Sequence, residues 1–277
     1  ILPDGVEIQC TVTIDPDAET VTVDLRDNPD NVAAGINMCE ANITSAATQA
    51  VFTGIGTNEI PRNSGSLRRL NILLREGCVI GIPKFPFSTS SATTHMSCRS
   101  INMITHCFTK MGPGFGAAEG GLGANLSTVV VAGHDPRNND EAFVNQLFVL
   151  GNGGPGREGS DGWQTWCTPG VSGMMWYDSW EIDEFKYPII IEKLEAQTDT
   201  AAAGRFRGAP QMEFVVRSRC RDLSIVLASD SRIIGPKGAL GGEGGRTGST
   251  YLLDVEGTPT RVSNFYQGEM GVGDRMR

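Results

Sequence analysis

Glycine clusters constrain this chain more than any other feature of its sequence. Its 277 residues include 35 Gly, and many gather at Gly112–Gly116, Gly120–Gly123, Gly151–Gly162 and Gly241–Gly245. Because Gly lacks a Cβ, it permits tight turns and close approach of two backbone segments. The clusters therefore predict connections that pack closely between layers of structure. Phosphate binding by backbone N–H groups is the alternative, but no cluster has the P-loop or dinucleotide-binding pattern.

Two alternating segments near the beginning of the chain predict a β-hairpin. Glu7–Ile14 and Thr20–Leu25 each place every second residue on one apolar face. Asp15-Pro16-Asp17-Ala18 lies between them and is a turn-forming sequence. We therefore expect two antiparallel strands with one buried face.

Two later segments predict helices. Asn37–Val51 is rich in Ala, has apolar residues near helical spacing, and is followed by Gly54 and Gly56. Ser97–Met111 has similar spacing and stops at Gly112. Further strands are predicted at Leu67–Leu74, Ser127–Ala132, Asn145–Leu150, Tyr187–Ala196, Gln211–Arg219, Leu223–Ala228 and Ser249–Val255.

This distribution of elements predicts the fold class. Strands dominate and the helices do not alternate with them, which favours an α+β fold with mainly antiparallel sheet, a few helices and Gly-rich loops. We find no internal repeat and no clean linker, so we expect residues 1–277 to form a single domain.

Charge and hydropathy exclude two classes of partner. The net charge is −9 and no run of Lys or Arg forms a stripe, which argues against nucleic acid. No stretch approaches the roughly 18–20 apolar residues of a membrane span. Seven Cys, an odd number, without an amino-terminal signal pattern indicate reduced thiols and a cytoplasmic location.

Two clusters contain residue types that commonly bind metal ions. His95, Cys98, His106 and Cys107 could bind zinc, but adjacent residues on a helix point about 100° apart, so buried thiols are the simpler interpretation. The acidic run Asp178–Glu184 could bind a cation, although such runs are usually solvated. We therefore predict no metal site in this chain.

Two segments carry candidate binding residues. Asp199–Gly208 reads DTAAAGRFRG and brackets Arg205 and Arg207 between glycines. Arginine forks bind carboxylates and phosphates in a bidentate manner, but a pair of arginines can equally form salt bridges at a subunit contact. The Gly153–Gly162 segment contains Asp161, which could line a site or face water. No His lies in a motif that demands a general base.

The order of motifs along the chain is more informative than any one of them. Leu2-Pro3-Asp4-Gly5 comes first, followed by Ala34–Asn37 and by Ile60–Arg68. Gly153–Gly156 with Asp161-Gly162, Tyr187-Pro188, Asp199–Gly208, Ser229-Asp230 and Gly241–Gly245 follow in that order. This series resembles the carboxyl-terminal half of the hydantoinase B family. The most specific elements are N-x-G-x-x-R, from Asn63 to Arg68, and D-[ST]-x-x-A-G-R-[FY]-R-G at Asp199–Gly208.

The resemblance implies a function within a complex. The family includes B subunits of N-methylhydantoinases, the matching half of 5-oxoprolinase, and subunits of acetone and acetophenone carboxylases. A hydantoinase A-type partner would use ATP and Mg²⁺ to phosphorylate a lactam or enol oxygen. The B-type component would then complete hydrolysis of a cyclic amide or carboxylation of a ketone. A non-catalytic scaffold of the same complex is the alternative, and an unrelated β-rich binding module is a third possibility.

The resemblance also implies which parts lie elsewhere. Family members carry a divalent metal such as Zn or Mn in the amino-terminal half, so we expect that half, or a separate chain, as a partner. The first residue is Ile1 rather than Met, as in a fragment, a processed product or a split subunit. On the motif positions we expect Asn63, Arg68, Asp161, Arg205 and Arg207 to bind substrate or phosphate.

Some positions depart from the family pattern. The chain has Ala201-Ala202 where a Gly pair is usual, and Ala209 where a second Gly often follows. Ser231 separates Asp230 from Arg232, which are commonly adjacent. These departures bear on the exact activity and leave hydrolase and carboxylase both open.

Overall fold

The structure is a computed structural model that describes residues 5–57, 59–121, 124–147, 153–164, 166 and 177–277. The chain divides into two compact units. Unit 1 comprises Ile1–Glu119, Gly156–Ser160 and Lys237–Glu243, and unit 2 comprises Gly120–Pro155, Asp161–Pro236 and Gly244–Arg277. Whether the two units fold together as the expected single domain stays a prediction.

Unit 1 contains a three-stranded sheet in the order β1-β2-β3. The strands β1 (Thr11–Asp15) and β2 (Thr20–Asp24) form the predicted antiparallel hairpin, paired from Thr11 opposite Asp24 to Asp15 opposite Thr20. The Asp15 carboxylate accepts the N–H groups of Asp17 and Ala18, which stabilises the turn. β3 (Leu70–Leu73) pairs with β2 in parallel, because α1 lies in the connection between them.

The helices of unit 1 begin and end near the predicted positions. α1 (Glu40–Ile55) stops at Gly56, whose φ of 74° is the left-handed conformation typical of a helix C-terminus. A π-helical turn (Ala92–Met96) leads into α3 (Ser97–Cys107), and a 3₁₀ turn (Phe108–Met111) follows it and ends at Gly112. The short helix α2 (Ser64–Leu67) was not predicted.

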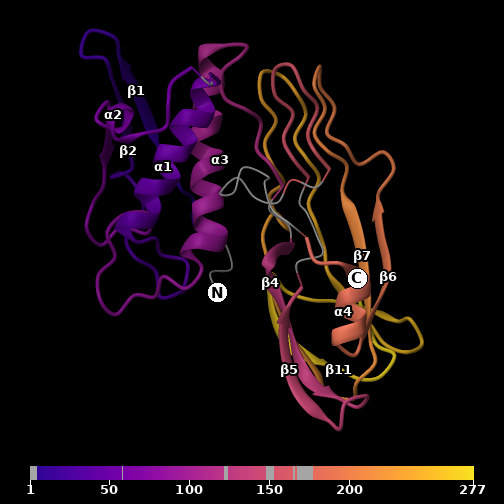
Figure 1. Ribbon diagram of the computed structural model, residues 1–277. Helices are drawn as coiled ribbons and strands as arrows, with labels where there is room; N and C mark the ends of the chain where they lie inside the picture. Colours follow the sequence, from indigo (N-terminus) through magenta and orange to yellow (C-terminus); the bar gives the residue numbers. More distant parts are fainter. Residues whose placement is uncertain (1–4, 58, 122–123, 148–152, 165, 167–176) are drawn as a thin grey trace. The chain divides into compact units, whose positions relative to one another are not determined.

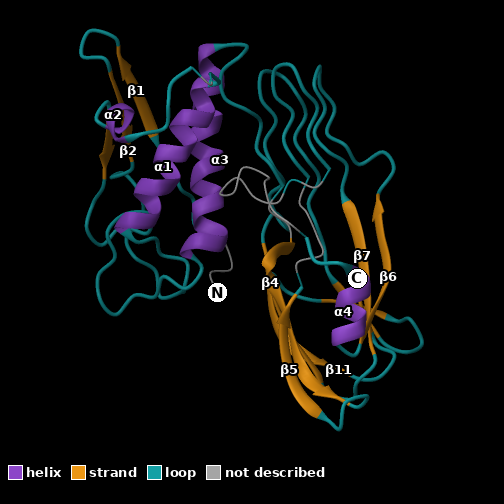
Figure 2. Cartoon of the chain, in the orientation of Figure 1, coloured by secondary structure: helices purple, strands orange, loops and turns teal. Residues whose placement is uncertain are grey.

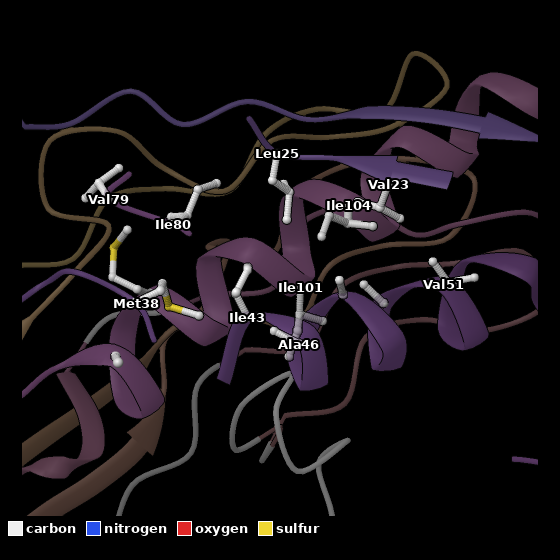
Figure 3. Close-up of a cluster of buried hydrophobic side chains, with 14 of the residues drawn as sticks. Val23, Leu25, Met38, Ile43, Ala46, Val51, Val79, Ile80, Ile101 and Ile104 are labelled. Atoms are coloured by element: carbon white, nitrogen blue, oxygen red, sulfur yellow. The ribbon is translucent and has the colours of Figure 1, made fainter. Parts of the chain in front are cut away.

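The core of unit 1 lies between this sheet and the two long helices. α1 and α3 pack against each other, as Figure 1 shows. Ile43 and Ala46 from α1 meet Ile101 and Ile104 from α3, together with Val23 from β2 (Figure 3). All these side chains are at most 3% exposed. Apolar residues at three- and four-residue spacing on both helices account for this packing.

The described residues of unit 2 form two sheets. The four-stranded sheet has the order β11-β8-β4-β5, with antiparallel pairing throughout. Figure 2 shows β4 and β5 side by side. Its strands are β4 (Ala124–Asp135), β5 (Glu141–Gln146), β8 (Leu223–Ser229) and β11 (Phe265–Met270).

The second sheet of unit 2 has five strands in the order β10-β9-β12-β7-β6. They are β6 (Ile189–Ala196), β7 (Met212–Ser218), β9 (Tyr251–Leu253), β10 (Pro259–Arg261) and β12 (Arg275–Met276). The helix α4 (Trp180–Lys186) directly precedes β6. Both sheets contribute to one hydrophobic core, which includes Val131, Ile189, Val216, Ile225 and Met276.

The predicted fold class is confirmed: the described residues form mainly antiparallel sheets with few helices. The predicted strand Asn145–Leu150 was placed too late, since β5 spans Glu141–Gln146, and residues 148–150 lie outside the described part. The sequence patterns did not predict α4, β10, β11 and β12.

In the described part of the chain, no helix has the length and apolar character needed to cross a membrane.

Candidate functional site

The DTAAAGRFRG segment is the connection between β6 and β7. Its base is closed by Thr200, whose hydroxyl donates to the Gln197 carbonyl at 2.7 Å and accepts the Gln211 N–H at 2.8 Å. Nearer the tip, the Gly208 N–H donates to the Ala202 carbonyl at 3.0 Å. The connection is therefore held by its own hydrogen bonds, and it carries Arg205 and Arg207 in its exposed part.

Parts of the Gly153–Gly162 segment lie directly against this connection. The Gly162 N–H donates to the Arg207 carbonyl at 2.8 Å, and the Ala209 N–H donates to the Gly154 carbonyl at 3.0 Å. The Gly154 N–H in turn donates to the Trp163 carbonyl at 2.9 Å. Two motifs that are about 45 residues apart in sequence thus form one structure, which we call the paired-loop site (Gly153–Pro155, Asp161–Trp163 and Asp199–Ala209).

The glycines of this site are required by close backbone contact. A Cβ on Gly162 would lie 2.1 Å from the Gly154 carbonyl oxygen and 2.7 Å from the Ala209 nitrogen. A Cβ on Gly154 would lie 2.9 Å from the Trp163 nitrogen. These contacts are with backbone atoms, which cannot rotate away. The expectation that the glycines allow close packing of loops is confirmed at these positions.

Asp161 and Arg207 form an ion pair across the two loops. Asp161 Oδ1 accepts the backbone N–H of Arg207 at 2.7 Å, and Oδ2 accepts Nη2 at 3.0 Å and Nε at 3.3 Å. The backbone N–H and then the guanidinium of Arg207 lower the pKa of the Asp161 carboxyl. Because the Arg207 and Asp161 side chains remain 68% and 47% exposed, the pair contributes little to stability and leaves guanidinium donors accessible.

Arg205 is the second cation of the paired-loop site. Its guanidinium carbon lies 5.3 Å from the centre of the Phe206 ring, within the range of a cation–π contact. The Arg205 side chain is exposed, whereas Phe206 is half-buried. The ring thus limits the directions that the guanidinium can take.

Asn63 and Arg68 lie at opposite ends of α2, in unit 1. Asn63 is the N-cap: its Oδ1 accepts the N–H groups of Gly65 at 2.8 Å and Ser66 at 3.2 Å. Arg68 is the C-cap, and its side chain is exposed. A Cβ on Gly65 would lie 3.0 Å from Asn63 Oδ1, close to the capping hydrogen bonds.

The five predicted residues therefore fall into two groups. Asp161, Arg205 and Arg207 lie together in unit 2, and Asn63 and Arg68 lie together in unit 1. The first group presents two exposed arginines with a carboxylate that orients one of them. Such a group can bind an anion, because arginine donors match the oxygens of carboxylate and phosphate.

A histidine and aspartate pair in unit 2 was missed. His134 Nδ1 lies 2.6 Å from Asp222 Oδ2, and this hydrogen bond lowers the pKa of Asp222. The pair lines a hollow of about 300 Å³ together with Pro136, Asp140 and Arg221. His134 is near the end of β4 and Asp222 follows β7, so their 88-residue separation gave no sequence signal.

The metal-binding residue types do not gather in the described residues, which contain no group of three or more His, Cys, Asp or Glu able to hold a metal ion. His95 Nδ1 pairs with the Thr94 hydroxyl at 2.9 Å, Cys98 is buried, and Cys107 lies against Cys10. Part of the acidic run lies in α4, where Asp183 is buried; Asp178 and Glu181 are exposed, as expected for a solvated run. The described residues therefore do not form a site that fits a resident metal.

Two comparisons by sequence identify relatives. The family model described as Hydantoinase B/oxoprolinase matches residues 1–277. The chain is 29% identical over 119 residues to caprolactamase subunit beta of Pseudomonas jessenii, covering 42% of this chain and 20% of that protein. It is 24% identical over 258 residues to 5-oxoprolinase of Saccharomyces cerevisiae, covering 91% of this chain and 19% of that protein. The chain thus spans about a fifth of the length of these curated relatives.

Solved structures share the fold. The crystal structure of the ATP-dependent caprolactamase from Pseudomonas jessenii superimposes with a TM-score of 0.78 at 20% identity, covering the whole of this chain and 48% of that one. A nucleotide-free acetone carboxylase gives a TM-score of 0.79 at 14% identity, covering 96% of this chain and 39% of that one. Since the family model covers the whole sequence, the chain belongs to the hydantoinase B/oxoprolinase family.

Proposed function

We propose that this chain is part of the B-type component of a multi-subunit, ATP-dependent enzyme that acts on a small molecule. A hydantoinase A-type partner would use ATP and Mg²⁺ to phosphorylate the substrate, and the B-type component would complete the reaction. The observation that carries this proposal is the family match over residues 1–277. The metal of the family, the amino-terminal half that would hold it and a cytoplasmic location remain predictions from the resemblance and the sequence.

Hydrolysis of a cyclic amide is the favoured reaction. The curated relatives named above are a caprolactamase subunit and a 5-oxoprolinase. The acetone carboxylase, by contrast, is similar in fold at 14% identity. We therefore propose a lactam or hydantoin as the substrate, with carboxylation of a ketone as the alternative.

The paired-loop site is the proposed binding region within this chain. Arg205 and Arg207 offer guanidinium donors to a phosphorylated or carboxylate-bearing substrate. The Asp161 carboxylate holds Arg207 in place by accepting hydrogen bonds from the backbone N–H and the guanidinium of Arg207. We include Asn63 and Arg68 as lower-ranked candidates, in which Asn63 acts as a positioning residue because it caps the helix that ends at Arg68.

A scaffold role is the second candidate function. The mutual pairing of Asp161 and Arg207 at the surface supports it, since an exposed ion pair can serve equally in a subunit contact. In that case Arg205 would meet a neighbouring subunit rather than a substrate.

Turnover of the complex tests the proposal. The chain is purified with its natural partners, and ATP hydrolysis is measured with hydantoins, lactams and ketones. We expect stimulation by a cyclic amide without dependence on bicarbonate. Stimulation that requires both a ketone and bicarbonate would favour carboxylation, and no stimulation by any of these compounds would refute the enzyme assignment.

Two arginine variants test the site within the same complex. Arg205→Ala is expected to lower kcat/KM at least about tenfold, because a lost hydrogen bond to a charged group costs about 1.5–3 kcal/mol. Arg261→Ala on β10 is the matched control, since it also removes an exposed guanidinium from unit 2. Dissociation of the complex by Arg205→Ala would support the scaffold role, and full activity in an intact complex would exclude both roles for Arg205.

A further inference from the structure

Two cysteines from distant parts of unit 1 meet at hydrogen-bond distance. Cys10 immediately precedes β1, and Cys107 is the last residue of α3. Their sulfur atoms lie 3.3 Å apart, although 97 positions separate them in sequence. Both thiols are free and half-buried. A disulfide bond is about 2.05 Å long, so the sulfurs need to approach by only about 1.2 Å to form one.

The surroundings of the pair make one thiol the better nucleophile. The hydrogen bond with Cys10 lowers the pKa of Cys107 to about 7 against the opposing effect of burial. The charge of Lys110, one helical turn further along, lowers the pKa of both thiols. The same hydrogen bond, with burial, raises the pKa of Cys10. Because the thiolate is the reactive form, Cys107 is the sulfur that an oxidant should meet first.

Three other cysteines of the described residues are less suited to this chemistry. Cys78, Cys98 and Cys220 are at most 1% exposed, and burial in particular raises the pKa of Cys220. Cys39 is half-buried like the pair and precedes α1. Cys167 lies outside the described residues.

We propose that Cys10 and Cys107 form a redox modification site, at which a peroxide converts the two thiols into one intramolecular disulfide. Its product ties the segment entering β1 to the end of α3. This assignment is independent of the proposed function, because it requires only the two sulfurs and a peroxide.

The reaction proceeds in two balanced steps. The Cys107 thiolate attacks one oxygen of hydrogen peroxide; an S–O bond forms, the O–O bond breaks, and hydroxide leaves and takes up a proton as water. The Cys10 sulfur then attacks the sulfur of the Cys107 sulfenic acid. An S–S bond forms, the S–O bond breaks, and the proton of Cys10 leaves with the hydroxyl group as a second water. The two sulfurs are oxidised and the peroxide is reduced.

Peptide mapping of the intact protein tests the proposal. The protein, in its natural complex, is treated with hydrogen peroxide, its remaining thiols are alkylated, and it is digested without reductant. We expect a peptide that joins Cys10 to Cys107, lighter by two hydrogen atoms than the separate peptides and absent after reduction. Joined peptides involving other cysteines instead, or oxidation of Cys107 to sulfinic acid without a cross-link, would overturn the proposal.

Single variants separate the roles of the two thiols. In Cys10→Ser, the Cys107 sulfenic acid has no resolving partner, so its capture by a dimedone-type probe should increase several-fold over the native protein. In Cys107→Ser, Cys10 should stay reduced at the same peroxide concentration. Cys39→Ser is the matched control and should form the cross-link at the native rate. Equal probe capture by native protein and Cys10→Ser would show that Cys10 does not resolve the sulfenic acid, which contradicts the proposal.

Discussion

The Asp183 carboxyl group is buried on α4, whereas Glu181 on the same helix faces water. Asp183 is 4% exposed, and among the described residues its Oδ2 has no hydrogen-bond partner. Its Oδ1 accepts a long bond of 3.5 Å from Asn145. Burial, assisted by the nearby charge of Asp178, raises the pKa of Asp183 from 3.8 to about 6. The folded protein therefore holds this proton more tightly than the unfolded chain does.

Replacing this acid should stabilise the protein at neutral pH. The pKa of Asp183 is higher in the folded state, so its contribution to stability is fully present below about pH 4 and is lost as pH rises through about 6. Asp183→Asn should therefore be more stable than the native protein at pH 7.5, by up to about 3 kcal/mol, with the advantage shrinking toward pH 4. Urea unfolding of both proteins across this range measures the difference.

Glu181→Gln provides the control for charge alone. It removes one negative charge from the same helix, but Glu181 is exposed and the Ser179 hydroxyl lowers its pKa. This variant should not gain stability at pH 7.5. A gain equal to that of Asp183→Asn would mean that net charge, rather than burial of Asp183, sets the effect.

At the scale of elements, the paired-loop site depends on backbone segments that come too close for a side chain. Gly162→Ala places a Cβ among backbone atoms of Gly154 and Ala209. Because neither can move without breaking the hydrogen bonds between the loops, we expect a loss of about 2 kcal/mol or more in the free energy of unfolding. Denaturant unfolding measures this loss, and turnover of the complex should fall with it.

Gly248→Ala is the matched control for that substitution. Gly248 also lies in unit 2, and a Cβ there would meet nothing within 4 Å. We expect its stability to stay within about 0.5 kcal/mol of the native value. If both alanine variants are equally destabilised, the effect comes from the backbone freedom of Gly rather than from the contact between the loops.

The elements differ in how far the sequence predicts them. The hairpin, α1 and α3 were predictable because alternation or helical spacing marks a buried face. Gly56 ends α1, and Gly112 ends the 3₁₀ turn that follows α3. β10 and β12 were not, since they have three and two residues and too few side chains to show a period. α4 was taken for a solvated acidic run because four of its seven residues are charged.

At the scale of the whole molecule, each of the two units is built from three separate segments of the chain. Gly156–Ser160 and Lys237–Glu243 belong to unit 1, yet residues of unit 2 flank both segments. When one unit unfolds, the segments of the other unit that are joined to it in sequence are therefore no longer held at their ends. We predict that calorimetry of the purified chain shows one cooperative transition, as expected for a single domain.

Two variants sharpen this test. Gly54→Ala in unit 1 places a Cβ 2.4 Å from the buried Phe108 ring, and Gly162→Ala acts in unit 2. Both should lower the midpoint of the same transition. Two resolved transitions, each shifted by only one of the variants, would show that the units unfold independently and that the single-domain prediction is wrong.

The sequence by itself determined the family, the mainly antiparallel α+β fold and the motifs that mark the paired-loop site. These depend on residue type and on spacing along the chain, which determine both the local structural preferences and the resemblance to the family. Only the tertiary structure decided that Asp161 meets Arg207, that Cys107 meets Cys10 rather than His106, and that His134 meets Asp222. Each of these pairs joins residues 46 to 97 positions apart, and no local pattern records which distant side chains a fold brings together.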